Sequence, residues 1–208
     1  MAARQTVKLV DAIALDANNA ECWQQQVAFA DLARVYRHHG RMAEARDHLH
    51  LALGAHREAK HRQFEAGTLE ALVVVCARLG EFAEALQHAD RAVQLCAGRD
   101  PYQEGVLRVE LAEVLAVLGR LDEALASFRL GLVLFRQTGN ADGESHALAG
   151  IGDVHRRMGR YAEALESLNQ AQSVATSNRQ LVREGRSRLR LGELYRELGL
   201  LDDALTNL

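Results

Sequence analysis

The sequence predicts an all-α fold in which helical hairpins follow one another as a solenoid. The segment LGEFAEAL at 79–86 returns as LGRLDEAL at 118–125, MGRYAEAL at 158–165 and LGLLDDAL at 198–205, with a fainter copy, HGRMAEAR, at 39–46. The glycines of these copies are spaced by 39 or 40 residues: Gly40, Gly80, Gly119, Gly159 and Gly199. Such a period is typical of repeat proteins, because each unit has an apolar face that only its neighbours can cover.

Each repeat is predicted to be a pair of helices that meet at its glycine. Apolar residues run at helical spacing before Gly119 (Val106, Leu107, Leu111, Val114, Leu115, Leu118) and after it (Leu121, Leu125, Phe128, Leu132, Phe135). Glycine supplies the left-handed geometry that ends the first helix of such a hairpin. We expect helices near 5–16, 23–39, 42–57, 62–79, 82–96, 101–118, 121–136, 141–158, 161–176, 180–198 and 201–208.

Other residues indicate where the repeats begin and where their helices pass closest. In GRDPYQ, Asp100 is expected to be an N-cap and Pro101 the first helical residue, while TGNADG and TSNRQ mark two further boundaries. The alanine of each EAL triplet, such as Ala124, comes five residues after the glycine. A larger side chain there would push the two helices of the hairpin apart.

These features resemble the tetratricopeptide repeat. The family pattern has Leu-Gly followed by Tyr on the first helix, and Ala followed four residues later by an aromatic on the second. Repeat five offers Leu191-Gly192, Tyr195 and Ala204, and the place of Tyr195 is taken by Cys76 in repeat two. The period of about 40 is longer than the family's usual 34, so both helices are expected to be longer by part of a turn.

The resemblance covers essentially the whole chain. It implies a right-handed superhelix of about eleven helices, forming a single array of about five repeats over 1–208. Because 11–23 looks like the tail of one repeat and Leu208 falls within a second helix, we expect an excerpt of a longer protein. Apolar surface at the C-terminal end of the array, including Leu201 and Leu205, predicts self-association or fraying there.

The composition of the chain limits the kinds of partner and the cellular compartment that we expect. The chain has 25 Lys and Arg against 28 Asp and Glu, a net charge of −3, which gives no electrostatic case for nucleic acid or an anionic membrane. The longest apolar stretch, ALVVVCA at 71–77, is too short to span a bilayer. Three cysteines without framework spacing favour reduced thiols, so we expect a cytoplasmic protein.

No pattern in the sequence indicates catalysis. Neither a nucleophile elbow, nor an H-E-x-x-H, phosphate-binding or dinucleotide motif occurs, so we expect a protein that is not an enzyme and binds no cofactor. Six of the nine histidines fall in repeat one, at positions 38, 39, 48, 50, 56 and 61. None of their separations places two imidazoles at i, i+4 on one face, so no metal site is expected.

The resemblance implies that the first helix of each repeat lines a concave groove that binds other proteins. On that face the candidate partner-binding residues are Arg34, Arg37, Arg78, Val106, Val109, Val117, Arg156, Arg157, Arg186 and Arg196. The valines would form an apolar floor, with arginines towards both ends. The expected partner is therefore a protein or peptide segment with an apolar centre and acidic flanks. The alternative is that these arginines only keep a helix face solvated.

Three functions remain open from the sequence. The first is a protein- or peptide-binding scaffold within a cytoplasmic regulatory or signalling protein. The second is a sensory array that binds a small peptide or effector and controls an output domain outside this chain. The third is an architectural spacer or dimerisation segment. The sequence does not name the partner.

Overall fold

The computed structural model describes residues 22–200, and side chains from Phe29 onward. The helices are α2 (Cys22–His38), α3 (Met42–Glu58), α4 (Arg62–Leu79), α5 (Phe82–Cys96), α6 (Pro101–Val117), α7 (Leu121–Thr138), α8 (Ala141–Arg157), α9 (Tyr161–Ser177) and α10 (Leu181–Glu197). Every boundary lies within two residues of its predicted position, and no strand occurs between residues 22 and 200. The all-α prediction is confirmed. The helices expected at 5–16 and 201–208 lie outside the described residues.

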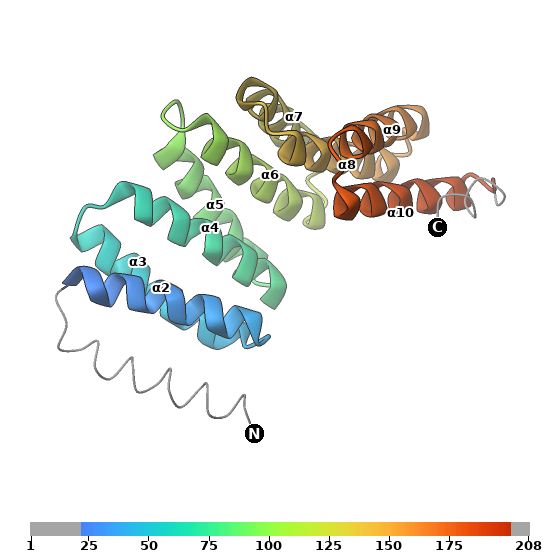
Figure 1. Cartoon of the computed structure of the whole chain (residues 1–208). Coiled ribbons are helices and arrows are strands. Elements are labelled where there is room, and N and C mark those ends of the chain that lie inside the picture. The colour runs from blue at the N-terminus through green and yellow to red at the C-terminus, as the bar shows by residue number, and fades with distance from the viewer. Residues whose placement is uncertain (1–21, 201–208) are drawn as a thin grey trace. The chain divides into compact units, whose positions relative to one another are not determined.

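The chain divides into two compact units, residues 1–95 and 96–208. In the first unit α2 packs against α3 and α3 against α4 (Figure 1). In the second unit each of α6 to α9 packs against the next helix, and α8 also contacts α6 and α10. Thus the first helices of neighbouring repeats touch within the second unit. A single array over 1–208 stays a prediction.

The corners of the hairpins have the left-handed conformation that the sequence predicts. Gly80 ends α4 with φ of 80°, its N–H donates to the carbonyl of Ala77, and the N–H of Glu81 donates to the carbonyl of Cys76. These bonds satisfy carbonyls that the end of a helix leaves without partners. The glycines at 40, 119, 159 and 199 likewise have positive φ.

The turns between repeats also contain a left-handed residue. It is Gly98 or Gly139 at two of these turns, but Lys60 and Arg179, each with φ of 56°, at the other two. Asp100 caps α6 as predicted, because its carboxylate accepts a hydrogen bond from the N–H of Gln103 at 3.0 Å. A side chain with a Cβ is strained at φ near 56°, so Lys60 and Arg179 cost stability that glycine would not.

The core of each hairpin is built around small residues. Ala45, Ala85, Ala124 and Ala164, one from each of four successive second helices, are all fully buried. In the second unit, glycines of α8 make room for aromatic rings of α7: a Cβ at Gly150 would lie 2.4 Å from the ring of Phe128. The position that holds Tyr36 in repeat one holds Cys76 and His155 in later repeats, and all three are buried.

Candidate functional site

A basic cleft lies in the first unit, between the ends of α2 and α4. It has a volume of about 570 Å³ and is lined by Arg34, Val35, Arg37, His38, His39 and Arg78. The three arginines were predicted from sequence as partner-binding residues, and the structure brings them together. It does so because positions 34, 37 and 38 share one face of α2, and Arg78 occupies the corresponding last turn of α4.

The charge of this basic cleft is only partly compensated. Arg34 pairs with Asp31 at 2.9 Å, but both side chains are largely exposed, so the pair contributes little to stability. Within residues 29–200, Arg37 and Arg78 have no carboxylate within ion-pair distance. Two guanidinium groups are therefore available to bind an anionic group, which they can hold by paired hydrogen bonds.

An apolar pocket adjoins the basic cleft. It measures about 270 Å³ and is lined by Ala30, Ala33, Arg34, Arg37, Leu49, His56, Phe64, Gly67, Thr68 and Ala71. Arg34 and Arg37 line both hollows, so the two form one continuous surface. Phe64 is 59% exposed and its ring stacks on that of buried His56 at 5.5 Å. Nothing lies within 4 Å of a Cβ placed on Gly67, which leaves room for a ligand side chain.

The predicted valines of the second unit do not share one environment. Val117 is 57% exposed, Val106 is half-buried and Val109 is 3% exposed. A Cγ of Val109 lies 3.1 Å from where a Cβ of Gly131 would be, so this side chain belongs to the contact between α6 and α7. Val109 therefore offers a ligand almost no surface.

The predicted arginines of the second unit also differ. Arg156 donates to Asp153 at 2.7 Å and pairs with Glu197 of α10, so its guanidinium is already engaged. Arg157, Arg186 and Arg196 are exposed. These three remain available at the surface of their helices.

Sequence reasoning missed the ion pairs that join successive first helices in this unit. His146 of α8 lies 2.8 Å from Glu113 of α6, and Arg183 of α10 donates twice to Asp142 of α8, both at 2.8 Å. Burial acts to raise the pKa of Glu113, but the hydrogen bond and charge of His146, together with the charges of Arg190 and Arg183, lower that pKa overall. The partners lie 33 and 41 residues apart, and only the repeat period could have suggested them.

Two groups of side chains in the described part of the chain could hold a metal ion. One group consists of His50, Glu84 and His88, and the other of Cys76, Glu81 and Glu84. Within each group the possible ligand atoms lie within 4.8 Å of one another. Burial raises the pKa of Cys76 to about 12, so its sulfur is a thiol and a weak ligand near neutral pH. No metal site was predicted from the sequence because only the histidines of repeat one were compared with one another. His88 lies in repeat two and was not among them.

Between residues 22 and 200, no helix combines the length and the apolar character that crossing a bilayer requires.

Comparison with known proteins shows which repeat family the sequence matches. Two models of the tetratricopeptide repeat match the sequence, one over residues 66–91 and the other over 103–177. No curated protein matches it. Among solved structures, BtubC (BKLC) from P. vanneervenii is similar with a TM-score of 0.80 and 14% identity, over 100% of this chain and 89% of that one.

Two further solved structures show the same fold. A putative kinesin light chain from Podosopora anserina, described as nearly identical TPR-like repeats, has a TM-score of 0.75 and 17% identity, covering 90% of this chain and 93% of that one. PlcR from Bacillus thuringiensis, in complex with the peptide PapR7 and DNA, has a TM-score of 0.69 and 18% identity, covering 88% and 68%. Identities this low establish the fold alone.

Proposed function

Because the chain belongs to the tetratricopeptide repeat proteins, we propose that it is a scaffold that binds a protein or peptide segment. The observation that carries the proposal is the continuous surface made by the basic cleft and the apolar pocket. Such a surface recognises a ligand by charge at one part and by apolar contact at another. The protein acts by binding rather than by catalysis.

The chemistry of this surface defines the ligand. The guanidinium groups of Arg37 and Arg78 suit carboxylates, which accept two parallel hydrogen bonds from one arginine. The pocket beside Phe64 and Gly67 suits a single apolar side chain. We therefore assign the first unit a segment in which Asp or Glu residues lie beside a large apolar residue. Arg157, Arg186 and Arg196 of the second unit are proposed contacts for a further acidic part.

The family supports a binding role of this kind. The PlcR structure holds a peptide, and PlcR shares the fold of this chain. We propose a cytoplasmic regulatory or signalling setting, in which buried Cys76 and Cys96 remain reduced thiols.

The test begins with selection of peptides from a random library on the full chain. The expected result is enrichment of sequences with acidic residues beside an apolar one. Affinity is then measured by fluorescence anisotropy for wild type and for the double variant Arg37→Glu/Arg78→Glu. A loss of at least about tenfold is expected, because hydrogen bonds to charged groups contribute about 1.5–3 kcal/mol each.

A matched control changes the charge equally elsewhere. Arg62 and Arg99 are exposed and lie outside both hollows, so Arg62→Glu/Arg99→Glu should bind nearly as wild type does. Equal losses in the two double variants would show a general charge effect and would overturn the assignment of the cleft.

The pocket can be tested separately by filling it. Gly67→Leu places a side chain where the ligand's apolar residue is proposed to lie, and binding should weaken. Gly54→Leu on α3 is the control, since Gly54 also has nothing within 4 Å of its Cβ position but lies outside the pocket. Unchanged affinity in a folded Gly67→Leu variant would exclude the pocket as part of the site.

A further inference from the structure

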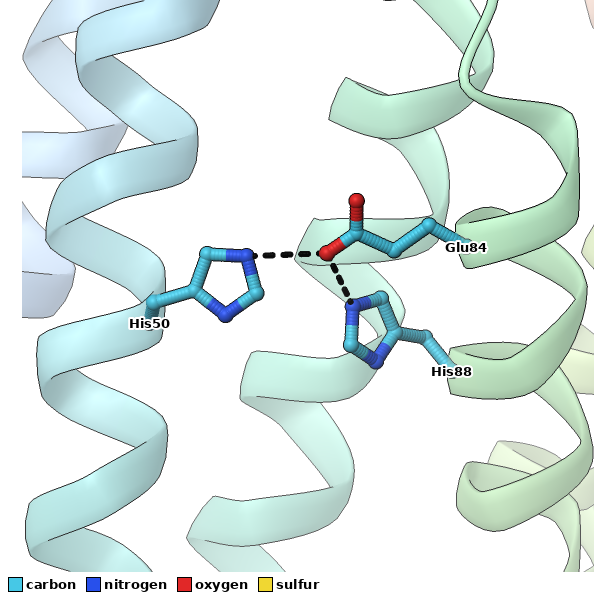
Figure 2. Close-up of side chains that lie close together, drawn as sticks. All are labelled: His50, Glu84 and His88. Atoms are coloured by element: carbon cyan, nitrogen blue, oxygen red, sulfur yellow. Dashed lines mark hydrogen bonds and ion pairs between the residues drawn. The ribbon is translucent and has the colours of Figure 1, made fainter.

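A cluster of two histidines and one glutamate links the second helices of repeats one and two. His50 projects from α3, while Glu84 and His88 project from the first two turns of α5 (Figure 2). The Nε2 atom of His50 lies 3.1 Å from Oε1 of Glu84, and the Nε2 atom of His88 lies 3.4 Å from the same oxygen. Two imidazole nitrogens thus converge on one carboxylate oxygen, and loss of the imidazole protons would leave three possible metal ligands side by side.

The helix register holds these side chains together. Glu84 and His88 are four residues apart, which places them on one face of α5. One turn before His50 on α3, Arg46 pairs with Glu81, which lies one turn before Glu84. This ion pair aligns α3 with α5, so that the next turn of each helix brings His50 opposite Glu84.

The spacing of the ligand atoms matches that around a small metal ion. An ion about 2.0–2.1 Å from nitrogen and oxygen ligands in tetrahedral geometry sets those atoms about 3.3 Å apart. The two nitrogen–oxygen distances of 3.1 and 3.4 Å lie on either side of this value. All three ligand atoms lie within 4.8 Å of one another. The His50 side chain is 40% exposed, so its ring has room to turn towards the other two ligands.

We propose that His50, Glu84 and His88 bind a zinc ion. Two imidazoles and one carboxylate form a ligand set that zinc takes in proteins, with water in the fourth position. The His88 side chain is 14% exposed, while His50 and Glu84 are 40% and 38% exposed. One side of the site is therefore covered and the other is open to the entering ion and its water.

The consequence of binding would be a cross-link between α3 and α5. Zinc bound to the folded chain stabilises the first unit by mass action. This role is independent of the proposed peptide-binding function, because none of the three ligands lines the basic cleft or the apolar pocket.

The test is titration of the full chain with zinc chloride by isothermal calorimetry. The expected result is one zinc ion per chain and a higher thermal midpoint in zinc than in chelator. The double variant His50→Asn/His88→Asn should lose binding. Glu84→Gln, which keeps the shape of the side chain, should weaken binding at least about tenfold, the loss that even an outer partner of a ligand can cause.

The matched control is His38→Asn/His39→Asn, which removes the same number of histidines from the exposed adjacent pair at the end of α2. It should bind zinc as wild type does. The visible absorption of bound Co²⁺ gives a second readout, and tetrahedral intensity is expected only when His50 and His88 are present. If wild type binds no zinc, if Glu84→Gln binds it as tightly, or if the control loses it instead, the proposal is wrong.

Discussion

Replacing Gly150 by alanine tests how closely α7 and α8 pack. Gly150 lies in the middle of α8, opposite the Phe128 ring of α7, which is 2% exposed. A Cβ at Gly150 would lie 2.4 Å from both Cε1 and Cζ of that ring. Carbon atoms that are not bonded favour a separation of about 3.5–4.0 Å. The added methyl group therefore overlaps the ring by about 1 Å, and the buried ring has no solvent space to move into.

Two opposing effects set the size of the change. Alanine favours an α-helix over glycine by about 1 kcal/mol, whereas overpacking a dense core costs about 1–3 kcal/mol. The overlap here places the cost in the upper part of that range, so Gly150→Ala should lower the free energy of unfolding by about 1–2 kcal/mol. Gly185 of α10 is the control, because nothing lies within 4 Å of its Cβ position. Gly185→Ala should raise stability by about 0.5–1 kcal/mol.

The two variants are compared with wild type by urea unfolding followed by far-ultraviolet circular dichroism. Both glycines lie in the second unit, so the same transition is observed for both. In thermal unfolding each kcal/mol corresponds to about 2–4 °C for a chain of this size. If Gly150→Ala is as stable as Gly185→Ala, the ring of Phe128 is not held against Gly150, and the inferred packing of α7 on α8 is refuted.

Three further predictions follow from the same structure. Ala124→Leu should cost about 1–3 kcal/mol by overpacking a fully buried position, and an unchanged thermal midpoint would show that the hairpin contact lies elsewhere. Arg179→Gly should raise stability by about 0.5–1 kcal/mol, because it removes the strain of a left-handed residue with a Cβ; a loss of stability in urea unfolding would contradict this. Burial, with the charges of Arg129 and Arg160, lowers the pKa of His155 against the opposite effect of Glu163. The unfolded chain therefore takes up this proton at a higher pH than the folded chain does, as the pH falls through about 6.5. The thermal midpoint should fall between about pH 7.5 and 5.5, and less so in His155→Tyr.

The helices could be predicted closely because one signal defines them. The apolar period and the glycine corners recur in every repeat. Where one copy is ambiguous, the helix bounds can therefore be predicted from the other copies. The same period brought Arg34, Arg37 and Arg78 to one cleft, because Arg37 and Arg78 lie in the last turns of α2 and α4 and Arg34 shares the face of Arg37.

Other parts of the site depend on contacts that the repeat pattern does not show, some within one hairpin and some between neighbouring repeats. Val109 lies on a helix that packs against α7, and the repeat pattern alone did not show that its side chain points there. The cluster of His50, Glu84 and His88 requires the alignment of two second helices, which rests on the ion pair of Arg46 with Glu81. The engagement of Arg156 by Glu197 likewise depends on the neighbouring repeat.

The ion pairs between first helices also bear on how such a chain can evolve. The corners are nearly identical from repeat to repeat, yet the pair of Asp142 with Arg183 has no counterpart one repeat earlier, where Tyr102 stands in place of Asp142. Deleting repeat four by recombination would preserve every hairpin but leave Arg183 facing a phenol ring instead of a carboxylate. Repeats four and five are thus specific for each other through this pair of charges, even though the shapes of the hairpins are nearly the same.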